Sequence, residues 1–315
     1  MEEKDLEQVN KTNKATFAAL EKKEHLYNLG ARLRVIDNWR MYLTGNENGN
    51  FVAEDNNKIV GYCFTHQWGT TGFIGPLGVE PEYQGHQIGT DLLLIGVDSL
   101  IKRTVTTLGL EGISQSPSNI AFYLKAGFQP GKLTCSLIRT IKQKFPDTIF
   151  HETLECIDYR KVSESERSSL LEESFKITNA ISPGLDFLFE MERTAFFHFG
   201  TTLFFIDKSA VQGFAILHDH PYFQGEKKSI VRVKAMVFKP GTSESVVDTA
   251  FTLIDKFTRD CGCEIFQISV NCHHWMWLNH LLLMGFLIEM TNIRMLYPGY
   301  QENIPEESPC FTRWV

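Results

Sequence analysis

The sequence predicts an α/β protein of two similar domains in tandem, each with a mixed, mostly antiparallel sheet that contains one parallel β-α-β crossover flanked by helices. Its 315 residues fit two domains of about 150 residues each. A composition of 43% hydrophobic and 22% charged residues is typical of globular chains. Internal repetition supports the tandem arrangement, because residues 51–66 align with residues 203–218 without a gap. The aligned pairs include Asp55 with Asp207, Gly61 with Gly213 and His66 with His218.

Each aligned segment predicts a β-hairpin, since two apolar runs flank a polar turn. The likeness continues downstream, where residues 77–79 answer to 235–237 and residues 126–128 answer to 284–286. The second copy carries extra residues around 219–228, in a loop where insertions are tolerated. Chance similarity of two amphipathic segments is the alternative, and the shared order of elements argues against it.

The other elements of the first half follow from periodicity and capping residues. Leu93, Val97 and Leu100 form an apolar helical stripe, and Ser116 with Pro117 is a typical helix start. The expected order is helices over 5–20 and 21–43, the hairpin 51–66, a strand over 73–79, a helix over 88–103, a strand over 105–113, a helix from 116 to 127 and a strand over 133–141.

The predicted division is a first domain over residues 1–145, a second over 153–300 and a tail over 301–315. The linker is expected near 141–156, which carries charge and one proline. The second half is expected to open with a strand near 157–162. The first half has no counterpart, so its first strand is either missing or supplied from elsewhere, with 311–315 as the candidate.

Composition also excludes several classes of protein. A net charge of -7 argues against a nucleic-acid partner, and no stretch approaches the ~20 apolar residues of a membrane helix. The charged start of the chain is not a secretory signal, and seven scattered cysteines indicate reduced thiols in a cytoplasmic protein. We expect no metal, because Cys261, Cys263, Cys272, His273 and His274 do not have a standard zinc spacing. The oligomeric state is left open.

One loop, between a predicted strand and a predicted helix, is a candidate phosphate site. It runs Gln84, Gly85, His86, Gln87, Ile88, Gly89 and Thr90. Backbone N–H groups of such a loop, together with the field of the helix N-terminus, bind phosphate without a basic side chain. Its glycines allow close approach of the backbone. Taken alone, a glycine-containing turn before a helix is more often just a turn.

The segment around this loop resembles the acyl-CoA signature of the GNAT superfamily of N-acetyltransferases, Gln/Arg-x-x-Gly-x-Gly/Ala. The resemblance includes Gly78, Val79 and Pro81 ahead of the loop, and Gln84 and Gly89 match the signature. The sequence departs from the family at position 87, where a glutamine stands in place of the first glycine. That departure puts one backbone contact to the pyrophosphate in doubt.

A second motif strengthens the resemblance. Residues 119–128, from Asn119 through Tyr123 to Gly127-Phe128, resemble the helix that follows the fifth strand of the family, with shorter spacing. The two motifs occur in the expected order. The resemblance is strong over residues 50–130 and fainter over 155–300.

The resemblance implies an N-acetyltransferase with acetyl-CoA as co-substrate. The pantetheine arm would enter a gap between the strands 73–79 and 105–113 and contact the backbone of Leu77, Gly78 and Val79. A free N–H there would stabilise the oxyanion. Asn119 and Phe122 would complete the cofactor site, and Tyr123 would be the general acid. An unperturbed tyrosine has a pKa near ~10, against ~8.5 for a thiol.

The resemblance leaves the general base open. Glu111 is the candidate for this role in the catalytic site, and Glu80, His66 and an ordered water are alternatives. The acceptor is expected to be a primary amine on a small molecule rather than on a protein. A non-catalytic acyl-CoA-binding or regulatory protein is the alternative function, and Gln87 is the feature that favours it.

The second half is expected to keep the fold and lose the cofactor site. Alignment places Thr242, Ser243 and Val247 where the first half has Gln84, Gly85 and Gly89, and it replaces Tyr123 with a leucine, Leu281. Valine does not readily take a positive φ. The second half is expected to complete the substrate cleft or to stabilise the first half, and the architecture is similar to that of tandem GNAT proteins.

Overall fold

The computed structural model describes residues 1–27, 29–45, 48–142, 145 and 151–314. The first half contains α1 (Leu6–Glu24), α2 (Ile36–Leu43), β1 (Phe51–Asp55), β2 (Lys58–Trp68), β3 (Thr71–Val79), α3 (Ile88–Lys102), β4 (Thr107–Ile113), α4 (Pro117–Lys125) and β5 (Gln129–Thr140). The second half contains β6 (Leu154–Asp158), α5 (Glu164–Ile181), α6 (Leu188–Phe196), β7 (Gly200–Asp207), β8 (Ala210–His218), β9 (Ile230–Phe238), α7 (Glu244–Asp260), β10 (Ile265–Asn271), α8 (Trp275–Leu283), β11 (Leu287–Leu296) and β12 (Cys310–Thr312).

The predicted fold class is confirmed. Each half contains the expected antiparallel hairpin, β1–β2 in the first and β7–β8 in the second. Parallel pairs β3–β4 and β9–β10 follow, with α3 and α7 as the crossover helices. Both hairpin turns hold two residues at positive φ, Asn56 with Asn57 and Lys208 with Ser209. Such turns match the twist of the flanking strands.

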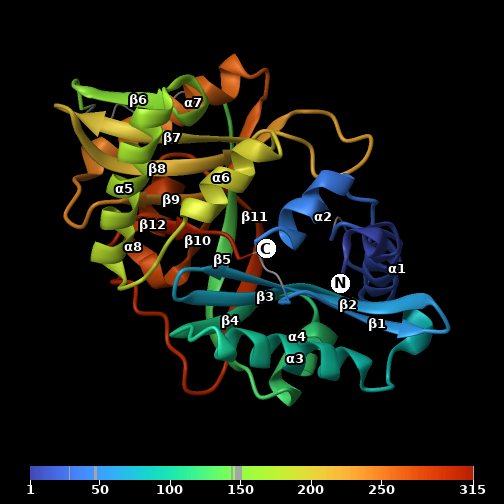
Figure 1. Cartoon of the computed structure of the whole chain (residues 1–315). Coiled ribbons are helices and arrows are strands. Elements are labelled where there is room, and N and C mark those ends of the chain that lie inside the picture. Colours follow the sequence, from blue (N-terminus) through green and yellow to red (C-terminus); the bar gives the residue numbers. More distant parts are fainter. Residues whose placement is uncertain (28, 46–47, 143–144, 146–150, 315) are drawn as a thin grey trace.

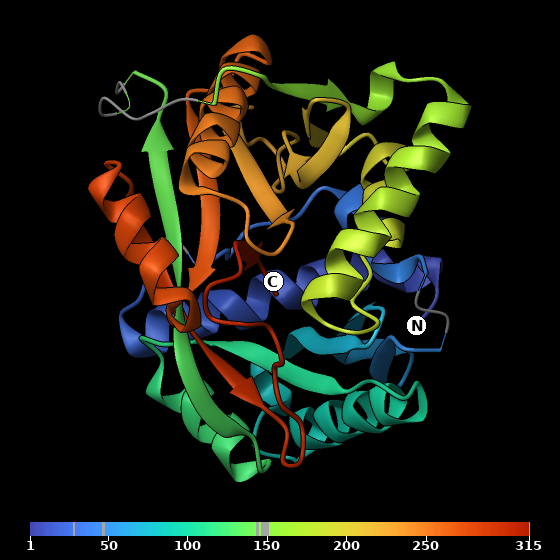
Figure 2. The same cartoon turned by 90° about the vertical axis from the view of Figure 1, so that its left-hand side faces the viewer.

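The two halves share one sheet and exchange their last strands. The order of the strands in the described residues is β1-β2-β3-β4-β11-β5-β10-β9-β8-β7-β6, with β12 paired to β9. Strand β11 of the second half, which corresponds to β5, therefore pairs with β4, and β5 of the first half pairs with β10. Figures 1 and 2 show β5 running from one half into the other. The boundary predicted between 145 and 153 stays a prediction, since 143–144 and 146–150 lie outside the described residues.

Three expectations for individual segments need correction. The helix expected over 21–43 is interrupted: α1 ends at Glu24, where His25 takes a left-handed conformation (φ 55°). Asn10 then holds the following segment by bonding both the N–H and the carbonyl of Arg34, at 2.8 and 2.9 Å. The strand expected near 157–162 lies at 154–158.

The candidate first strand of the first half belongs elsewhere. Cys310–Thr312 forms β12 and pairs with β9 of the second half. No strand of the described residues pairs with the outer edge of β1, which ends the sheet.

Helices cover both faces of the first half. α3 packs on the face of β2, β3 and β4 that carries Cys63, Ile74 and Leu110. α1 and α2 cover the other face, where Val9 of α1 and Trp39 and Tyr42 of α2 belong to one buried cluster with Tyr62 and Phe64 of β2. Figure 1 shows α3 and α4 on one side of the β1–β4 ribbons and α1 and α2 on the other. Among the described helices, none combines the length and the apolar character needed to cross a bilayer.

Candidate active site

β3 and β4 separate beyond their first four paired residues. Their parallel register joins Thr71–Ile74 to Thr107–Leu110 and then stops. The rest of β3 continues to pair with β2 on its other side, through residues 77–79. Pro76 sits just past the separation and has no N–H to offer a neighbouring strand. The structure thus contains the gap expected between these strands.

The edge of β3 that faces this gap presents backbone polar groups. The Glu80 N–H donates to the Val60 carbonyl at 2.8 Å, so Val60 and Glu80 form a hydrogen-bonded antiparallel pair. Alternation then turns the N–H and carbonyl groups of Leu77 and Val79 away from β2. The Val79 carbonyl accepts bonds from Thr16 Oγ1 and Gln84 Nε2, each at 3.1 Å.

A cavity of about 460 Å³ opens beside this edge. It lies between α1, the end of β3, the N-terminus of α3 and α4. The lining residues are Thr16, Ala19, Leu20, Lys23, Leu77, Gly78, Val79, Tyr83, Gln84, Gly85, Gln87, Ile88, Gly89, Thr90, Ser118, Asn119, Phe122 and Tyr123.

The structure brings together all but one of the predicted cofactor residues. His86 is the exception: its ring lies outside the lining, and Nδ1 is 3.3 Å from the Tyr83 carbonyl. The sequence analysis missed the wall contributed by α1, from Thr16 to Lys23. No motif marks this wall, because its residues reach the cavity only through the packing of α1 on β3.

The loop before α3 adopts a strained conformation that opens its N–H groups. Gly85 has φ 85° and Gln87, the N-cap of α3, has φ 64°. Gln87 therefore takes the left-handed conformation that glycine adopts most easily, at a cost of roughly 1–2 kcal/mol. No side chain caps α3, and the N–H groups of its first turn have no acceptor within the helix. They and the helix field form an anion-binding end.

Small residues let α4 lie close to the strands. A Cβ at Gly112 of β4 would come within 3.3 Å of Tyr123 Cδ2. Asn119 Oδ1 accepts the Ile113 N–H at 2.9 Å, which fixes the start of α4 against the end of β4. A Cβ at Gly89 would come within 3.5 Å of the Phe122 ring.

Burial raises the pKa of Tyr123 to about 12, and the hydrogen bond with Asn119 acts in the opposite direction. The hydroxyl therefore stays protonated at neutral pH. It can donate a proton in the cavity but does not serve there as a base.

Residues 14–128 match the sequence profile of the acetyltransferase (GNAT) family. The first half of this chain is a GNAT domain. A comparison with curated proteins found no significant match.

Solved structures of similar fold cover the whole chain. A proposed acetyltransferase from Pyrococcus horikoshii has a TM-score of 0.65 at 15% identity, over 100% of this chain and 93% of the other. A GCN5-related N-acetyltransferase from Sphaerobacter thermophilus has a TM-score of 0.61 at 10% identity, over 97% and 96%. A tandem GNAT protein from the clavulanic acid biosynthesis pathway has a TM-score of 0.60 at 12% identity, over 96% and 97%. These likenesses establish the tandem GNAT fold.

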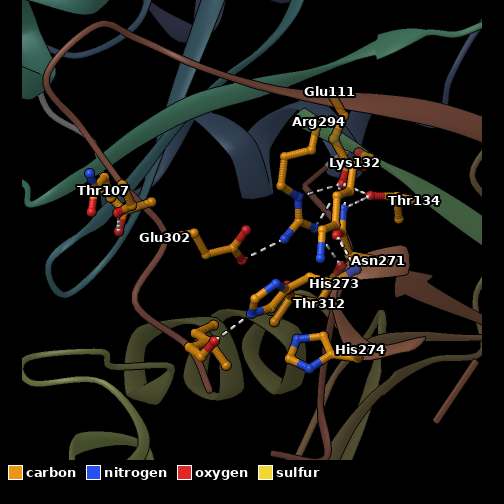
Figure 3. Close-up of polar contacts among 12 residues, drawn as sticks. Thr107, Glu111, Lys132, Thr134, Asn271, His273, His274, Arg294, Glu302 and Thr312 are labelled. Carbon is orange, nitrogen blue, oxygen red and sulfur yellow. Dashed lines mark hydrogen bonds and ion pairs between the residues drawn. The ribbon is translucent and has the colours of Figure 1, made fainter. Parts of the chain in front are cut away.

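The structure does not bring Glu111 to the cavity of the GNAT domain. Its side chain is 1% exposed, and Oε1 accepts bonds from Arg294 Nη2 and Thr134 Oγ1, both at 2.7 Å. Figure 3 shows Arg294 between Glu111 and Glu302. On β4, Gly112 faces α4, so its neighbour Glu111 points to the opposite face of the sheet. The Glu111 carboxylate is thus engaged in an ion pair outside the cavity lining, which counts against its assignment as general base.

The alternative bases have other partners as well. Glu80 Oε1 accepts a bond from Thr12 Oγ1 at 2.8 Å. His66 Nε2 lies 2.8 Å from the Gly75 carbonyl, so this nitrogen carries the proton. Burial, with Arg193 and Lys234 nearby, holds the pKa of His66 well below its usual range and keeps the ring neutral.

In the second half the corresponding gap is filled by the chain itself. β9 and β10 pair only over residues 230–232 and 265–267. Beyond them, β12 pairs with residues 235–237, the positions that answer to Leu77–Val79 of the GNAT domain. Phe311 of β12 packs against Trp277 of α8, with ring centroids 6.0 Å apart. A strand thus occupies the place that a cofactor arm would need.

The cysteine and histidine group near residue 272 is structural. His273 Nε2 donates to the Ile304 carbonyl and His274 Nδ1 to the Glu306 carbonyl, at 2.8 and 3.0 Å. These bonds tie the tail to the start of α8, and Figure 3 shows the bond made by His273. Within the described part of the chain, no group of three or more His, Cys, Asp or Glu side chains is placed to hold a metal ion.

Proposed function

We propose that this chain transfers an acetyl group from acetyl-CoA to a primary amine on a small molecule, by direct transfer within a ternary complex. One observation carries the proposal. A single cavity is lined by the open N-terminus of α3, by the free edge of β3 and by the Tyr123 side chain. These are the groups that a diphosphate, a pantetheine amide and a leaving thiolate each require.

The diphosphate would lie on the N–H groups at the start of α3. Gly85 and Gln87 hold the left-handed conformations that turn successive N–H groups to one side. The pantetheine arm would continue along β3, where the Leu77 N–H and carbonyl and the Val79 N–H face the gap. The α1 wall, with Leu20 and Lys23, closes the other side of the cavity.

The reaction would proceed by attack of the amine nitrogen on the thioester carbonyl. The C–N bond forms, the C–S bond breaks, and the Tyr123 hydroxyl supplies the proton to the departing sulfur. The proton lost by the amine leaves through water. A backbone N–H on the free edge of β3 would stabilise the tetrahedral oxyanion.

A small acceptor fits the arrangement of the two halves better than a protein lysine. The face of β3 opposite α3 is covered by the second half and by the tail, where Trp314 stacks on Phe73 with ring centroids 5.8 Å apart. A macromolecule could not approach this face.

All seven cysteines are free thiols, which supports a reducing, cytoplasmic compartment.

Calorimetry with acetyl-CoA, followed by thiol release with a panel of amines, tests the proposal. We expect one binding site and turnover of at least one small amine. Binding that is lost in Gly89→Val and kept in a control on the outer face of the same helix, Asp98→Asn, would support the site. Retention of full binding in Gly89→Val would contradict it, because a side chain there would fill the space beside Phe122.

The alternative, a non-catalytic acyl-CoA-binding or regulatory protein, is favoured by one observation. None of the lining residues, all within the described part of the chain, is Asp, Glu or His. The cavity therefore offers a proton donor but no side-chain proton acceptor. Tight acetyl-CoA binding without thiol release across the amine panel would select this alternative.

A further inference from the structure

A group of buried polar residues lies between the two halves. It consists of Arg34, Asn38, His66, Glu190 and Arg193, and we call it the interhalf cluster. The first three come from α2, its approach and β2, and the last two from α6. Their exposed fractions range from 0% for Asn38 to 9% for Arg34.

Each member has one buried polar atom for which the described residues provide no partner. The atoms are Arg34 Nε, Asn38 Nδ2, His66 Nδ1, Glu190 Oε1 and Arg193 Nε. A buried polar atom without a partner costs roughly 1–3 kcal/mol, and most such atoms in folded proteins are paired. Five such atoms lie in one region, where they are available to a polar ligand.

Contacts tie the cluster into one region around Tyr42. Arg34 Nη1 lies 3.1 Å from Asn38 Oδ1 and 3.4 Å from the Tyr42 hydroxyl. The Tyr42 ring meets the His66 ring edge-on at 4.8 Å.

The second half joins the cluster through α6. Arg193 donates to the Met41 carbonyl at 3.3 Å and is ion-paired with Glu190. Glu190 also accepts the Trp68 Nε1 proton at 2.9 Å, and the Trp68 and His66 rings both contact Phe73.

The cluster borders the point where acyl transfer would occur. His66 Nε2 donates to the carbonyl of Gly75, the first residue of β3 beyond its pairing with β4. The cofactor edge, Leu77 to Val79, begins two residues further along the strand. A ligand beside His66 would therefore reach the gap from the face opposite α3.

The chemistry of the unpaired atoms defines what such a ligand carries. Arg34 Nε, Asn38 Nδ2 and Arg193 Nε are donors, and two of them belong to guanidinium groups. Glu190 Oε1 is an acceptor, and His66 Nδ1 is another because the proton of the neutral ring is on Nε2. Guanidinium donors select a carboxylate, whereas a carboxylate and an imidazole acceptor suit an amine.

We propose that the interhalf cluster is the acceptor site, and that the acceptor is an amine that also carries a carboxylate. This inference rests on the proposed acetyl transfer. The carboxylate lies toward the guanidinium groups of Arg34 and Arg193, and the amine lies toward Glu190 and His66, next to Gly75.

The inserted loop of the second half restricts access to small molecules. The Val35 N–H donates to the Tyr222 carbonyl at 2.9 Å, and the Gln224 N–H donates to the Leu33 carbonyl at 2.8 Å. These bonds join the loop to the segment that carries Arg34. A hydrogen bond of 2.7 Å between Tyr222 and His218 fixes the loop to β8.

Thiol release from acetyl-CoA by the full-length protein tests the inference with matched acceptors. The panel consists of α-, β- and γ-amino acids, each with its carboxamide and its decarboxylated amine. We expect at least one amino acid to have a kcat/KM about tenfold or more above both of its matched compounds, because a hydrogen bond to a charged group is lost in each. Equal turnover within every set would overturn the inference.

Variants locate the effect in the cluster. Arg34→Gln should raise KM for the preferred amino acid about tenfold while KM for its carboxamide changes little. The exposed neighbour Arg32 provides the control, and Arg32→Gln should leave both unchanged. An equal effect of Arg34→Gln on both compounds would contradict the assignment. If Arg34→Gln does not fold, Asn38→Ala is assayed in the same way, and the comparison of matched acceptors with the wild-type protein still tests the inference.

An error in the acceptor assignment and an error in the proposed function would give different results. Acetyl-CoA binding without turnover of any carboxylate-bearing amine would overturn the acceptor assignment and leave the cofactor cavity in place. Loss of acetyl-CoA binding itself would overturn the proposed function and this inference with it.

Discussion

Gly112 and Tyr123 meet where α4 lies against β4, and a Cβ at Gly112 would come within 3.3 Å of the Tyr123 ring. The absence of a side chain at Gly112 lets the tyrosine lie deep enough to line the cavity while its pKa rises to about 12. The position of the Tyr123 phenol is therefore set by Gly112, which lies outside the lining of the cavity.

Replacing Tyr123 by Phe removes the proton donor and leaves the packing of the ring. We expect kcat to fall at least about 100-fold, the usual contribution of a general acid, and the Kd for acetyl-CoA to change less than about twofold. Because the pKa of Tyr123 is raised, the wild-type kcat should not decline between pH 7 and 10 through loss of this proton. Thiol-release assays against pH measure both effects, and an unchanged kcat in the variant would rule out the acid role.

Replacing Gln87 by Gly relieves the left-handed strain at the start of α3. We expect stability to rise by up to about 1 kcal/mol, seen as a higher midpoint in thermal unfolding, with acetyl-CoA binding at least as tight as in the wild type. Lys208 in the β7–β8 turn has φ 47° and is remote from the cavity. Lys208→Gly should give a similar gain in stability with no effect on acetyl-CoA. Weaker acetyl-CoA binding in Gln87→Gly would show that the glutamine side chain itself contacts the cofactor.

Local signals in the sequence were sufficient for most elements of the first half and for the hairpin of the second half. The turns at Asn56 and Lys208, the cap at Ser116 and the glycine at 127 each specify a short-range conformation, and the structure has all of them. The loop before α3 and the helix α4, which line the cavity, were predictable for the same reason, since each is a contiguous segment.

Contacts between distant segments were not predictable. The exchange of β5 and β11 pairs Ser136 with Met290 and with Ser269, and nothing in the periodicity of either strand distinguishes this pairing from one within a single half. The position of the Glu111 side chain was not predictable for a similar reason. Its partner, Arg294, lies 183 residues further along the chain, on the exchanged strand.

The filled gap of the second half predicts one acetyl-CoA site per chain. β12 pairs with residues 235–237, so restoring the lost motif residues should not restore binding. We expect calorimetry to give a stoichiometry of one for the wild type and for the double variant Val247→Gly with Leu281→Tyr. A second binding event in either protein would contradict the occlusion of this gap by β12.

Replacing Glu111 by Gln leaves Arg294 buried with a weaker partner. Arg294 is 4% exposed on its side chain and bonds Glu111, Glu302 and the Thr312 carbonyl. Glu302 still neutralises the guanidinium in this variant, so the cost is about 1–3 kcal/mol, and we expect a measurable loss of stability in urea unfolding. The folded fraction should retain its Kd for acetyl-CoA and its kcat. A catalytic defect in Glu111→Gln without loss of stability would restore Glu111 as a general base.

Stability should fall in mild acid because of His218. Burial lowers the pKa of His218 to about 3, against about 6.5 in an unfolded chain. Between these values the unfolded chain binds a proton that the folded chain does not, so the free energy of unfolding falls as pH falls, by about 1.4 kcal/mol per unit for this group. His66 shifts in the same direction. Urea unfolding at pH 7 and pH 5 measures the slope of stability against pH, which should be shallower in His218→Asn.

His280 provides a control of opposite sign, because its bond to Asp248 raises its pKa. Its stabilising effect is fully present below the pKa of the unfolded chain and is lost as pH rises through the pKa of the folded chain. His280→Asn should therefore make the acid slope steeper, and a shallower slope in that variant would contradict the assignment of the two histidines.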